Sequence, residues 1–307
     1  MNKMKPVNLH LKSVTIEDVE KHKLISTAEL CRDLENLKKF NAKTNKNSFA
    51  GNPFLYHFQL ENLLKCRREG GKTIHDIYND PVAWDKLIKY TRIRNRGGKT
   101  AAGNVFECFR INFGSVVMFK ATTAKYIYSK YNAWEVLDPC AGWGGRLLGA
   151  WALGIDYTGI DSNWNMKDAY DKMFMFLTEQ DVDTLFVPPR PKLRMLWGDC
   201  LEIDFKKIKY DLVLTSPPYI NLEQYEHMDL WESDKAYYYH FLFPLWEKCM
   251  RHIKKGGHVC LNISPKMYEA AQAYGIPKCN KEEHLKQQLG QKMNKKKQDM
   301  IYIWQQK

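Results

Sequence analysis

From about residue 133 to the end of the chain, short apolar runs alternate with segments of helical periodicity, and this alternation constrains the fold most strongly. Strands are predicted at 134–138, 157–161, 193–197, 210–215, 258–263 and 300–304, and helices between them at 146–153, 164–179 and about 235–253. Such alternation predicts an α/β fold, a mostly parallel sheet with helices on both faces, because parallel strands are joined by right-handed crossovers. Ligands in such sheets bind at the carboxyl ends of the strands.

The first 110 residues have a different pattern. Helical periodicity over 14–40, 54–67 and 81–92 predicts a small helical domain whose loops are polar or contain glycine. We therefore divide the chain into a basic, mainly helical domain, residues 1–110, and an α/β domain, residues 111–307.

The net charge of +12 is concentrated in the two flanks of the chain. Residues 1–110 carry 21 Lys and Arg against 12 Asp and Glu, residues 111–264 carry 17 against 19, and residues 265–307 carry 9 against 4. A near-neutral core with basic flanks is typical of an enzyme that binds a polyanion, although a solvated basic surface would give the same counts. The candidates for phosphate contacts lie in the basic, glycine-broken segment 92–100 and are Arg92, Arg94, Arg96 and Lys99.

Neither a membrane segment nor a metal site is indicated by the sequence. The chain begins Met-Asn-Lys-Met-Lys-Pro without a following apolar stretch, and no run approaches transmembrane length, so we expect a soluble, intracellular protein. The eight cysteines form no Cys-x-x-Cys pair, so we expect neither a zinc knuckle nor a disulfide framework.

The apolar run 212–214 leads directly into Thr-Ser-Pro-Pro-Tyr, residues 215–219. Two prolines cannot donate ladder hydrogen bonds and they fix the backbone of the turn that ends the strand. The turn would present the Ser216 hydroxyl, the Pro217 carbonyl and the face of Tyr219 together. Two acceptors beside a flat stacking surface suit a planar group that carries an NH₂, such as the amino edge of a nucleobase. Asn52-Pro-Phe-Leu-Tyr56 imitates this turn but has no strand before it.

The ends of the preceding predicted strands carry acids and glycines. The first ends in Asp-Pro-Cys-Ala-Gly-Trp-Gly-Gly-Arg, residues 138–146, whose glycines permit a tight turn and a close approach of the backbone to a ligand. Asp138 before this loop would repel a pyrophosphate and favour a ligand that carries an amine. The second strand ends in Asp161, which can accept both ribose hydroxyls, and the third ends in Asp199, near an adenine amino group. Three such acids fit an amino-acid-bearing nucleoside better than NAD.

Taken together, Asp-Pro-Cys-Ala-Gly-Trp-Gly-Gly-Arg, Gly-Ile-Asp, Gly-Asp-Cys and Thr-Ser-Pro-Pro-Tyr resemble the class I S-adenosylmethionine-dependent amino-methyltransferases that act on DNA. The resemblance covers roughly residues 115–264 and the final strand. It implies a Rossmann-like, mostly parallel sheet of seven strands and S-adenosylmethionine as the cofactor. The stretch 113–131 also resembles the segment that closes over the cofactor in these enzymes, although an amphipathic helix would read the same.

The resemblance also implies a role for each site residue. Around the methionine moiety it places Asp138, Pro139, Cys140, Ala141, Gly142 and Gly144, at the ribose Asp161, at the adenine Asp199 and Cys200, and at the target base Ser216, Pro217, Pro218 and Tyr219. In this family a serine in the first position of the target motif is associated with N4 of cytosine, and Asp or Asn with N6 of adenine. Ser216 therefore favours N4-cytosine, with N6-adenine as the alternative.

The layout departs from the family's usual one in a way that concerns the target. Only about sixteen residues separate Asp199 from Thr215, which leaves no room there for a target-recognition domain. Sequence readout must then come largely from residues 1–110. DNA is favoured over RNA, and methylation of an RNA base or of a protein glutamine amide remain alternatives. A degenerate fold that only binds nucleic acid is disfavoured because both motif sets are intact.

Overall fold

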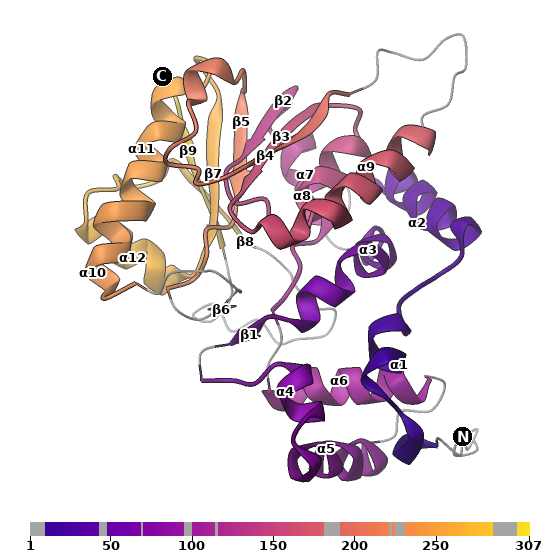
Figure 1. Ribbon diagram of the computed structural model, residues 1–307. Helices are drawn as coiled ribbons and strands as arrows, with labels where there is room; N and C mark the ends of the chain where they lie inside the picture. The colour runs from indigo at the N-terminus through magenta and orange to yellow at the C-terminus, as the bar shows by residue number, and fades with distance from the viewer. Residues whose placement is uncertain are drawn as a thin grey trace, which may run out of the picture.

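The computed structural model describes residues 10–42, 48–68, 70–94, 100–113, 116–180, 191–220, 223–224, 231–284 and 300–307 (Figure 1). Its centre is a seven-stranded sheet. In spatial order the strands are β4 (Leu193–Trp197), β3 (Asp156–Asp161), β2 (Glu135–Asp138), β5 (Leu212–Thr215), β7 (His258–Ile263), β9 (Met300–Gln305) and β8 (Lys281–His284). The first five are mutually parallel, and β9 is antiparallel to both its neighbours. The prediction of a Rossmann-like, mostly parallel, seven-stranded sheet is therefore confirmed.

Helices cover both faces of the sheet, as predicted (Figure 1). One face carries α7 (Ala121–Lys130), α8 (Gly145–Trp151) and α9 (Lys167–Gln180), and the other carries α10 (Asp234–Tyr237), α11 (Phe243–His252) and α12 (Pro265–Ala273). Strand β5 shows how one strand supplies both cores, because its side chains alternate in direction. Leu212 and Leu214 belong to the first core and Val213 to the second.

The edge strand β8 has no counterpart among the predicted strands. Its sequence, Lys-Glu-Glu-His, is wholly polar, and only Glu283 of the four residues is buried. Glu283 accepts a hydrogen bond from the Tyr126 hydroxyl (3.3 Å) and forms an ion pair with Lys130, so α7 stabilises this edge. A polar edge strand gives no apolar alternation from which it could be recognised.

The N-terminal region is helical, as predicted, but its first helix is interrupted. The elements are η1 (Leu11–Ser13), α1 (Ile16–Lys21), α2 (Thr27–Lys39), α3 (Asn52–Leu64), α4 (Ile74–Tyr78), α5 (Pro81–Ile93) and α6 (Ala101–Phe113). The prediction of one helix over 14–40 is wrong, because Ser26 begins a new helix with a reciprocal capping box to Glu29. Asn52 lies at the start of α3. The motif that imitates Ser216–Tyr219, which we call the target turn because it is predicted to face the target base, is therefore helical. Helices α4, α6 and α12 are not predicted by the sequence patterns.

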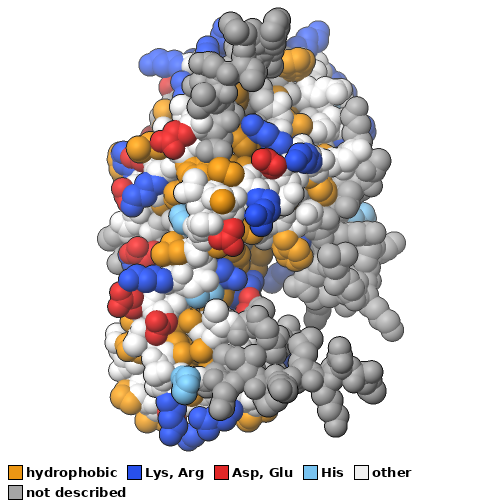
Figure 2. Space-filling model, turned by 90° about the vertical axis from the view of Figure 1, so that its right-hand side faces the viewer, with side chains coloured by type: hydrophobic (Ala, Val, Ile, Leu, Met, Phe, Trp, Pro, Cys, Tyr) orange, Lys and Arg blue, Asp and Glu red, His pale blue; other side chains and the backbone are white. Residues whose placement is uncertain are grey.

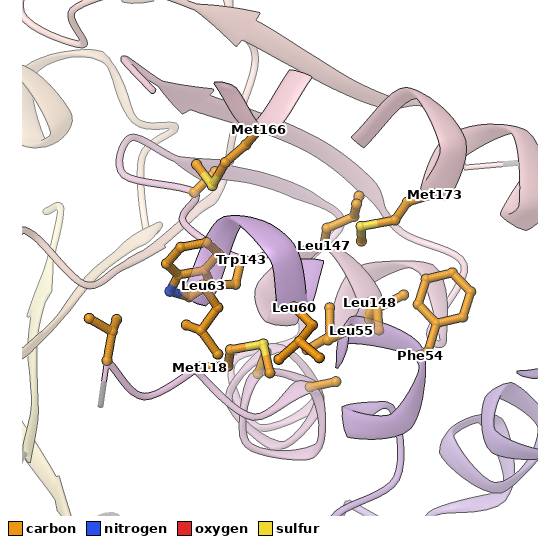
Figure 3. Packing of buried hydrophobic residues seen from close by; sticks show 14 of the residues in the cluster. Phe54, Leu55, Leu60, Leu63, Met118, Trp143, Leu147, Leu148, Met166 and Met173 are labelled. Atoms are coloured by element: carbon orange, nitrogen blue, oxygen red, sulfur yellow. The ribbon is translucent and has the colours of Figure 1, made fainter. Parts of the chain in front are cut away.

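Helices α2 and α3 pack on the same side of the sheet as α8 and α9. Figure 3 shows Leu55 and Leu60 of α3 beside Leu147 and Leu148 of α8 and Met173 of α9, and all five side chains are buried in one core. Part of the N-terminal region therefore shares its core with the sheet. The division of the chain at residue 110 stays a prediction.

Two buried charged side chains fix this packing. Asp33 of α2 accepts hydrogen bonds from the backbone N–H groups of Gly51 (3.0 Å) and Phe54 (3.1 Å), which satisfies donors at the start of α3. Lys125 of α7 donates to three carbonyls at the end of α2, those of Leu37, Lys38 and Phe40, at 2.8–2.9 Å. Each charge thus replaces water at a helix terminus.

A two-stranded ribbon connects the N-terminal region to the segment that follows the target turn. Strand β1 (Arg67–Arg68) pairs antiparallel with β6 (Glu223–Gln224). Since β6 lies only a few residues after Tyr219, the ribbon brings the N-terminal region close to the turn that follows β5.

Candidate active site at the carboxyl ends of the strands

The predicted cofactor and target motifs meet at one edge of the sheet, because β4, β3, β2 and β5 are parallel neighbours. Hydrogen bonds tie their loops together. The backbone N–H of Cys140 donates to Thr215 Oγ1 (3.0 Å), that of Ala141 to the Ile160 carbonyl (2.9 Å), and that of Gly198 to the Asp161 carbonyl (2.9 Å). The predicted site is therefore a continuous surface, in which the loop after β2 contacts those after β3 and β5.

Two glycines in the loop after β2 have backbone conformations that would be strained in any residue with a side chain. Gly142 and Gly144 have φ of +55° and +87°, in the left-handed region. A Cβ on Gly142 would meet only Arg146 Nη2, at 3.9 Å, so the space over this residue is open. A Cβ on Gly145 would lie 1.8 Å from the Phe119 carbonyl oxygen, so segment 116–120 packs directly on the start of α8.

Asp138 is fully buried and its charge is already balanced. Its Oδ2 accepts hydrogen bonds from Arg146 Nε (2.6 Å) and the Tyr157 hydroxyl (2.7 Å). Burial alone would lower the pKa of Arg146, but the Asp138 charge and hydrogen bond, together with Tyr157 and Tyr128, outweigh burial and raise that pKa. Arg146 Nη2 also donates to the Cys140 carbonyl and so holds the loop. Oδ1 of Asp138 is buried and has no hydrogen-bond partner in the described part of the chain.

Asp161 at the end of β3 is half-buried. Its Oδ2 accepts from the Gly142 N–H (2.8 Å) and its Oδ1 from the Asn163 N–H (2.9 Å). Burial raises the pKa of Asp161 to about 6, although these two hydrogen bonds oppose the shift. Each carboxylate oxygen keeps a second lone pair for a hydroxyl donor.

The residues after β4 have separate environments. Asp199 is exposed and accepts from the Leu201 N–H (2.7 Å), which forms a turn. Cys200 is buried, and its carbonyl accepts from Lys248 Nζ (3.0 Å). A hydrogen bond with the Cys200 thiol, together with burial, holds the pKa of the Cys140 thiol well above its usual value. Cys140 is therefore a neutral thiol and not a thiolate nucleophile.

The target turn follows β5 as predicted. Strand β5 ends at Thr215, Pro217 is buried, and Ser216, Pro218 and Tyr219 are half-buried. Ser216 Oγ donates to the Asn262 carbonyl on β7 (3.4 Å). The hydroxyl of Tyr237 on α10 donates to the Pro218 carbonyl (2.9 Å).

Three aromatic residues at this edge are absent from the predicted site. Trp164 is 59% exposed and lies beside Trp197, with ring centroids 5.9 Å apart. Tyr170 contacts Trp197 edge-on and its hydroxyl donates to the Gly142 carbonyl (2.7 Å). The position of Trp164, three residues after the strand-end Asp161, is the signal that could have identified it.

The predicted phosphate contacts are only partly described. Arg92 lies in the last turn of α5 and Arg94 follows it, and both are exposed. Arg96 and Lys99 lie outside the described residues. Figure 2 shows Lys and Arg side chains gathered at the lower end of the molecule, where Figure 1 places α5.

Two further findings concern ligands and membranes. Within the described ranges, no group of three or more His, Cys, Asp or Glu side chains is arranged to hold a metal ion. None of the helices in that part of the chain is both long enough and apolar enough to cross a bilayer.

Part of the chain matches a protein-family model, and its structure is similar to several solved structures. Residues 210–306 match the family model N6_N4_Mtase, described as DNA methylase. No curated protein matches the sequence significantly. Among solved structures, TrmN from Thermus thermophilus is 12% identical, with a TM-score of 0.43 over 67% of each chain. An RNA methyltransferase from Salinibacter ruber, solved with S-adenosyl-L-homocysteine, is 14% identical, with a TM-score of 0.38 over 62% of this chain and 93% of that one.

TehB from Haemophilus influenzae is 12% identical, with a TM-score of 0.39 over 66% of each chain. The observed fold, a mostly parallel seven-stranded sheet with helices on both faces, is of the α/β class. The family match supports a methyltransferase that uses S-adenosylmethionine, and it covers the part of the chain that carries the target turn and the last strands.

The buried pair of Asp138 and Arg146 gives a stability prediction. Arg146→Met should lower the free energy of unfolding by about 3 kcal/mol, because it leaves Asp138 buried without its partner. The control is Arg251→Met, which removes an exposed pair with Glu247 and should cost less than about 1 kcal/mol. Urea unfolding followed by fluorescence measures both, and equal losses would contradict this account of Asp138.

Proposed function

We propose that this protein transfers a methyl group from S-adenosylmethionine to the exocyclic amino group of a DNA base, N4 of cytosine in preference to N6 of adenine. The proposal rests on the Ser216–Tyr219 turn. This turn adjoins residues 139–144 between β2 and α8, the glycine loop, through the Cys140–Thr215 hydrogen bond. The match of residues 210–306 to a DNA methylase family supports it. Ser216 favours cytosine through the family resemblance.

The cofactor side of the edge has groups that suit S-adenosylmethionine, which supplies an electrophilic methyl group when bound. The open space over Gly142 admits a ligand close to the backbone. Asp161 accepts the ribose hydroxyls, and Asp199 and Cys200 lie at the adenine. Asp138 acts on the methionine end of the pocket by holding Arg146, which in turn holds the loop at the Cys140 carbonyl. Pro139, Cys140, Ala141 and Gly144 shape the wall of this pocket.

The target side provides positioning rather than a strong base. The lone pair of an exocyclic amine is delocalised into the ring, so the amine is a poor nucleophile. Ser216 and the Pro217 carbonyl accept its two N–H groups and favour a pyramidal nitrogen directed at the methyl group. The base must leave the duplex to reach them, and it stacks on Tyr219. Pro218 keeps the turn rigid, and the proton leaves after methyl transfer.

The N-terminal region supplies the contacts to the DNA backbone. The β1–β6 ribbon connects it to the segment after the target turn, so a duplex at the turn can also reach this region. Arg92, Arg94, Arg96 and Lys99 contact phosphates, which gives affinity without sequence specificity.

The direct test is methyl transfer from tritiated S-adenosylmethionine to duplex DNA, single-stranded DNA and RNA, with nucleoside mass spectrometry of the product. We expect N4-methylcytosine in DNA, and Ser216→Ala should lower kcat by about a hundredfold through loss of one positioned acceptor. Ser264→Ala is the control, because Ser264 also follows a strand of the sheet but caps α12.

Products other than N4-methylcytosine would change the proposal in different ways. N6-methyladenine would keep the mechanism and overturn the choice of base, and labelled RNA would overturn the choice of DNA. If cofactor binds and no nucleic acid is labelled, a protein amide becomes the substrate to test.

The raised pKa of Asp161 predicts a pH dependence of cofactor binding. The carboxylate that accepts the ribose hydroxyls predominates above a pKa of about 6 and is lost as the pH falls through that value. The affinity for S-adenosylmethionine should therefore be about tenfold weaker at pH 5 than at pH 7. In Asp161→Asn, affinity should be low at both values, whereas Asp168→Asn, on the exposed face of α9, should keep the wild-type slope. Calorimetric titration measures this, and an unchanged slope in Asp161→Asn would exclude Asp161 as its source.

Phosphate contacts predict a salt dependence. Replacing both Arg92 and Arg94 by Gln should reduce the slope of log K against log salt for duplex DNA by about two, because two released counterions are lost. The control replaces Lys207 and Arg251 by Gln. Both side chains are exposed elsewhere on the surface, so the salt dependence of DNA binding should keep its wild-type slope. Fluorescence anisotropy at several salt concentrations measures both, and equal slopes in the two double variants would remove Arg92 and Arg94 from the interface.

A further inference from the structure

The hydroxyl of Tyr237 forms a hydrogen bond to the backbone of the target turn. This side chain is fully buried, and its hydroxyl donates to the Pro218 carbonyl (2.9 Å). Its ring contacts Trp231 edge-on, with centroids 5.7 Å apart, and Phe241 at 5.5 Å. The ring is therefore fixed by packing, and the hydroxyl is a fixed point toward which the turn is directed.

Such a fixed point matters for this turn because two of its residues are prolines, which cannot donate a backbone hydrogen bond. Pro217 and Pro218 have no N–H group, so neither can join the turn to a neighbouring strand. Before the prolines, Thr215 is paired in the sheet and Ser216 is bonded to the Asn262 carbonyl. After them, the Pro218 carbonyl accepts the hydrogen bond from the Tyr237 hydroxyl. The Pro217 carbonyl thus lies between two anchored points.

We infer that Tyr237 is a positioning residue for methyl transfer, and that its hydroxyl sets the direction in which the Pro217 carbonyl faces the target amino group. This inference rests on the proposed function. Removing the hydroxyl frees the Pro218 peptide to rotate, which displaces the neighbouring carbonyl. A displacement of about 1 Å at a group that contacts the substrate can cost about a hundredfold in rate, even when the mutated residue, here Tyr237, touches no substrate.

The chain offers a matched control in Tyr210. This tyrosine is also fully buried, and its hydroxyl also donates to a backbone carbonyl, that of Cys249 on α11 (3.0 Å). Tyr237→Phe and Tyr210→Phe therefore each remove one hydroxyl group and its hydrogen bond to a backbone carbonyl, at two side chains that are equally buried. They differ in that only the first bond ends on the target turn.

The experiment compares the two variants in steady-state methyl transfer. We expect Tyr237→Phe to lower kcat by about ten- to a hundredfold, with KM for DNA and the affinity for S-adenosylmethionine within about threefold of wild type. Tyr210→Phe should keep the wild-type kcat while its melting temperature falls as much as that of Tyr237→Phe. A kcat for Tyr237→Phe within twofold of wild type, or an equal loss in both variants, would overturn the inference.

A second measurement keeps this inference separate from the proposed function. Hydrogen exchange with mass spectrometry reports the amides of Ser216, Tyr219 and Ile220 whether or not the protein methylates DNA. Exchange at these amides should be faster in Tyr237→Phe and unchanged in Tyr210→Phe. If the wild-type protein is inactive on every nucleic acid, the proposed function is wrong. Separately, unchanged hydrogen exchange in Tyr237→Phe would overturn the anchoring role of Tyr237, whatever the activity of the protein.

Discussion

Strand β2 pairs in parallel with both β3 and β5, and the site depends on this arrangement because it brings three chain reversals to the same edge. Once the strands are in register, short hydrogen bonds fix the loops relative to each other, as between Cys140 and Thr215 and between Gly142 and Asp161. The cofactor motif and the target motif are about seventy-five residues apart in the sequence, yet one hydrogen bond joins them. For the in-line methyl transfer that we propose, the relative position of donor and acceptor is decisive, and these hydrogen bonds between the loops would hold it.

Buried polar groups, rather than loops alone, hold the surroundings of this edge in place. Arg146 joins Asp138 to the glycine loop, and Tyr170 and Tyr237 hold the carbonyls of Gly142 and Pro218. Farther out, Lys125 fixes the end of α2 against α7. Such groups are costly to bury unless they are fully bonded, so each specifies one arrangement of the backbone it contacts.

The sequence predicts the features that are encoded locally. Apolar runs bounded by turn residues locate six of the seven strands, and the prolines after Thr215 locate the end of β5. It fails where long-range contacts decide the structure. Strand β8 is stabilised by contacts of Glu283 with α7 about 150 residues away, and its own sequence is polar. The Tyr237–Pro218 bond, likewise, leaves no periodicity to detect. Asp138 and Arg146 both lie within the motif at 138–146. Only the structure shows that the two side chains form a buried ion pair, so that Asp138 is not an unpaired carboxylate.

We propose that the cofactor and the target base meet between the glycine loop and the Ser216–Pro217 turn. A crystal structure of the complex with S-adenosyl-L-homocysteine tests it most directly. We expect the ribose hydroxyls of the ligand to lie on Asp161, its amino-acid end to lie over Gly142, and its sulfur to face the turn. A ligand bound away from this edge, or a sulfur directed away from Ser216 and Pro217, would contradict it.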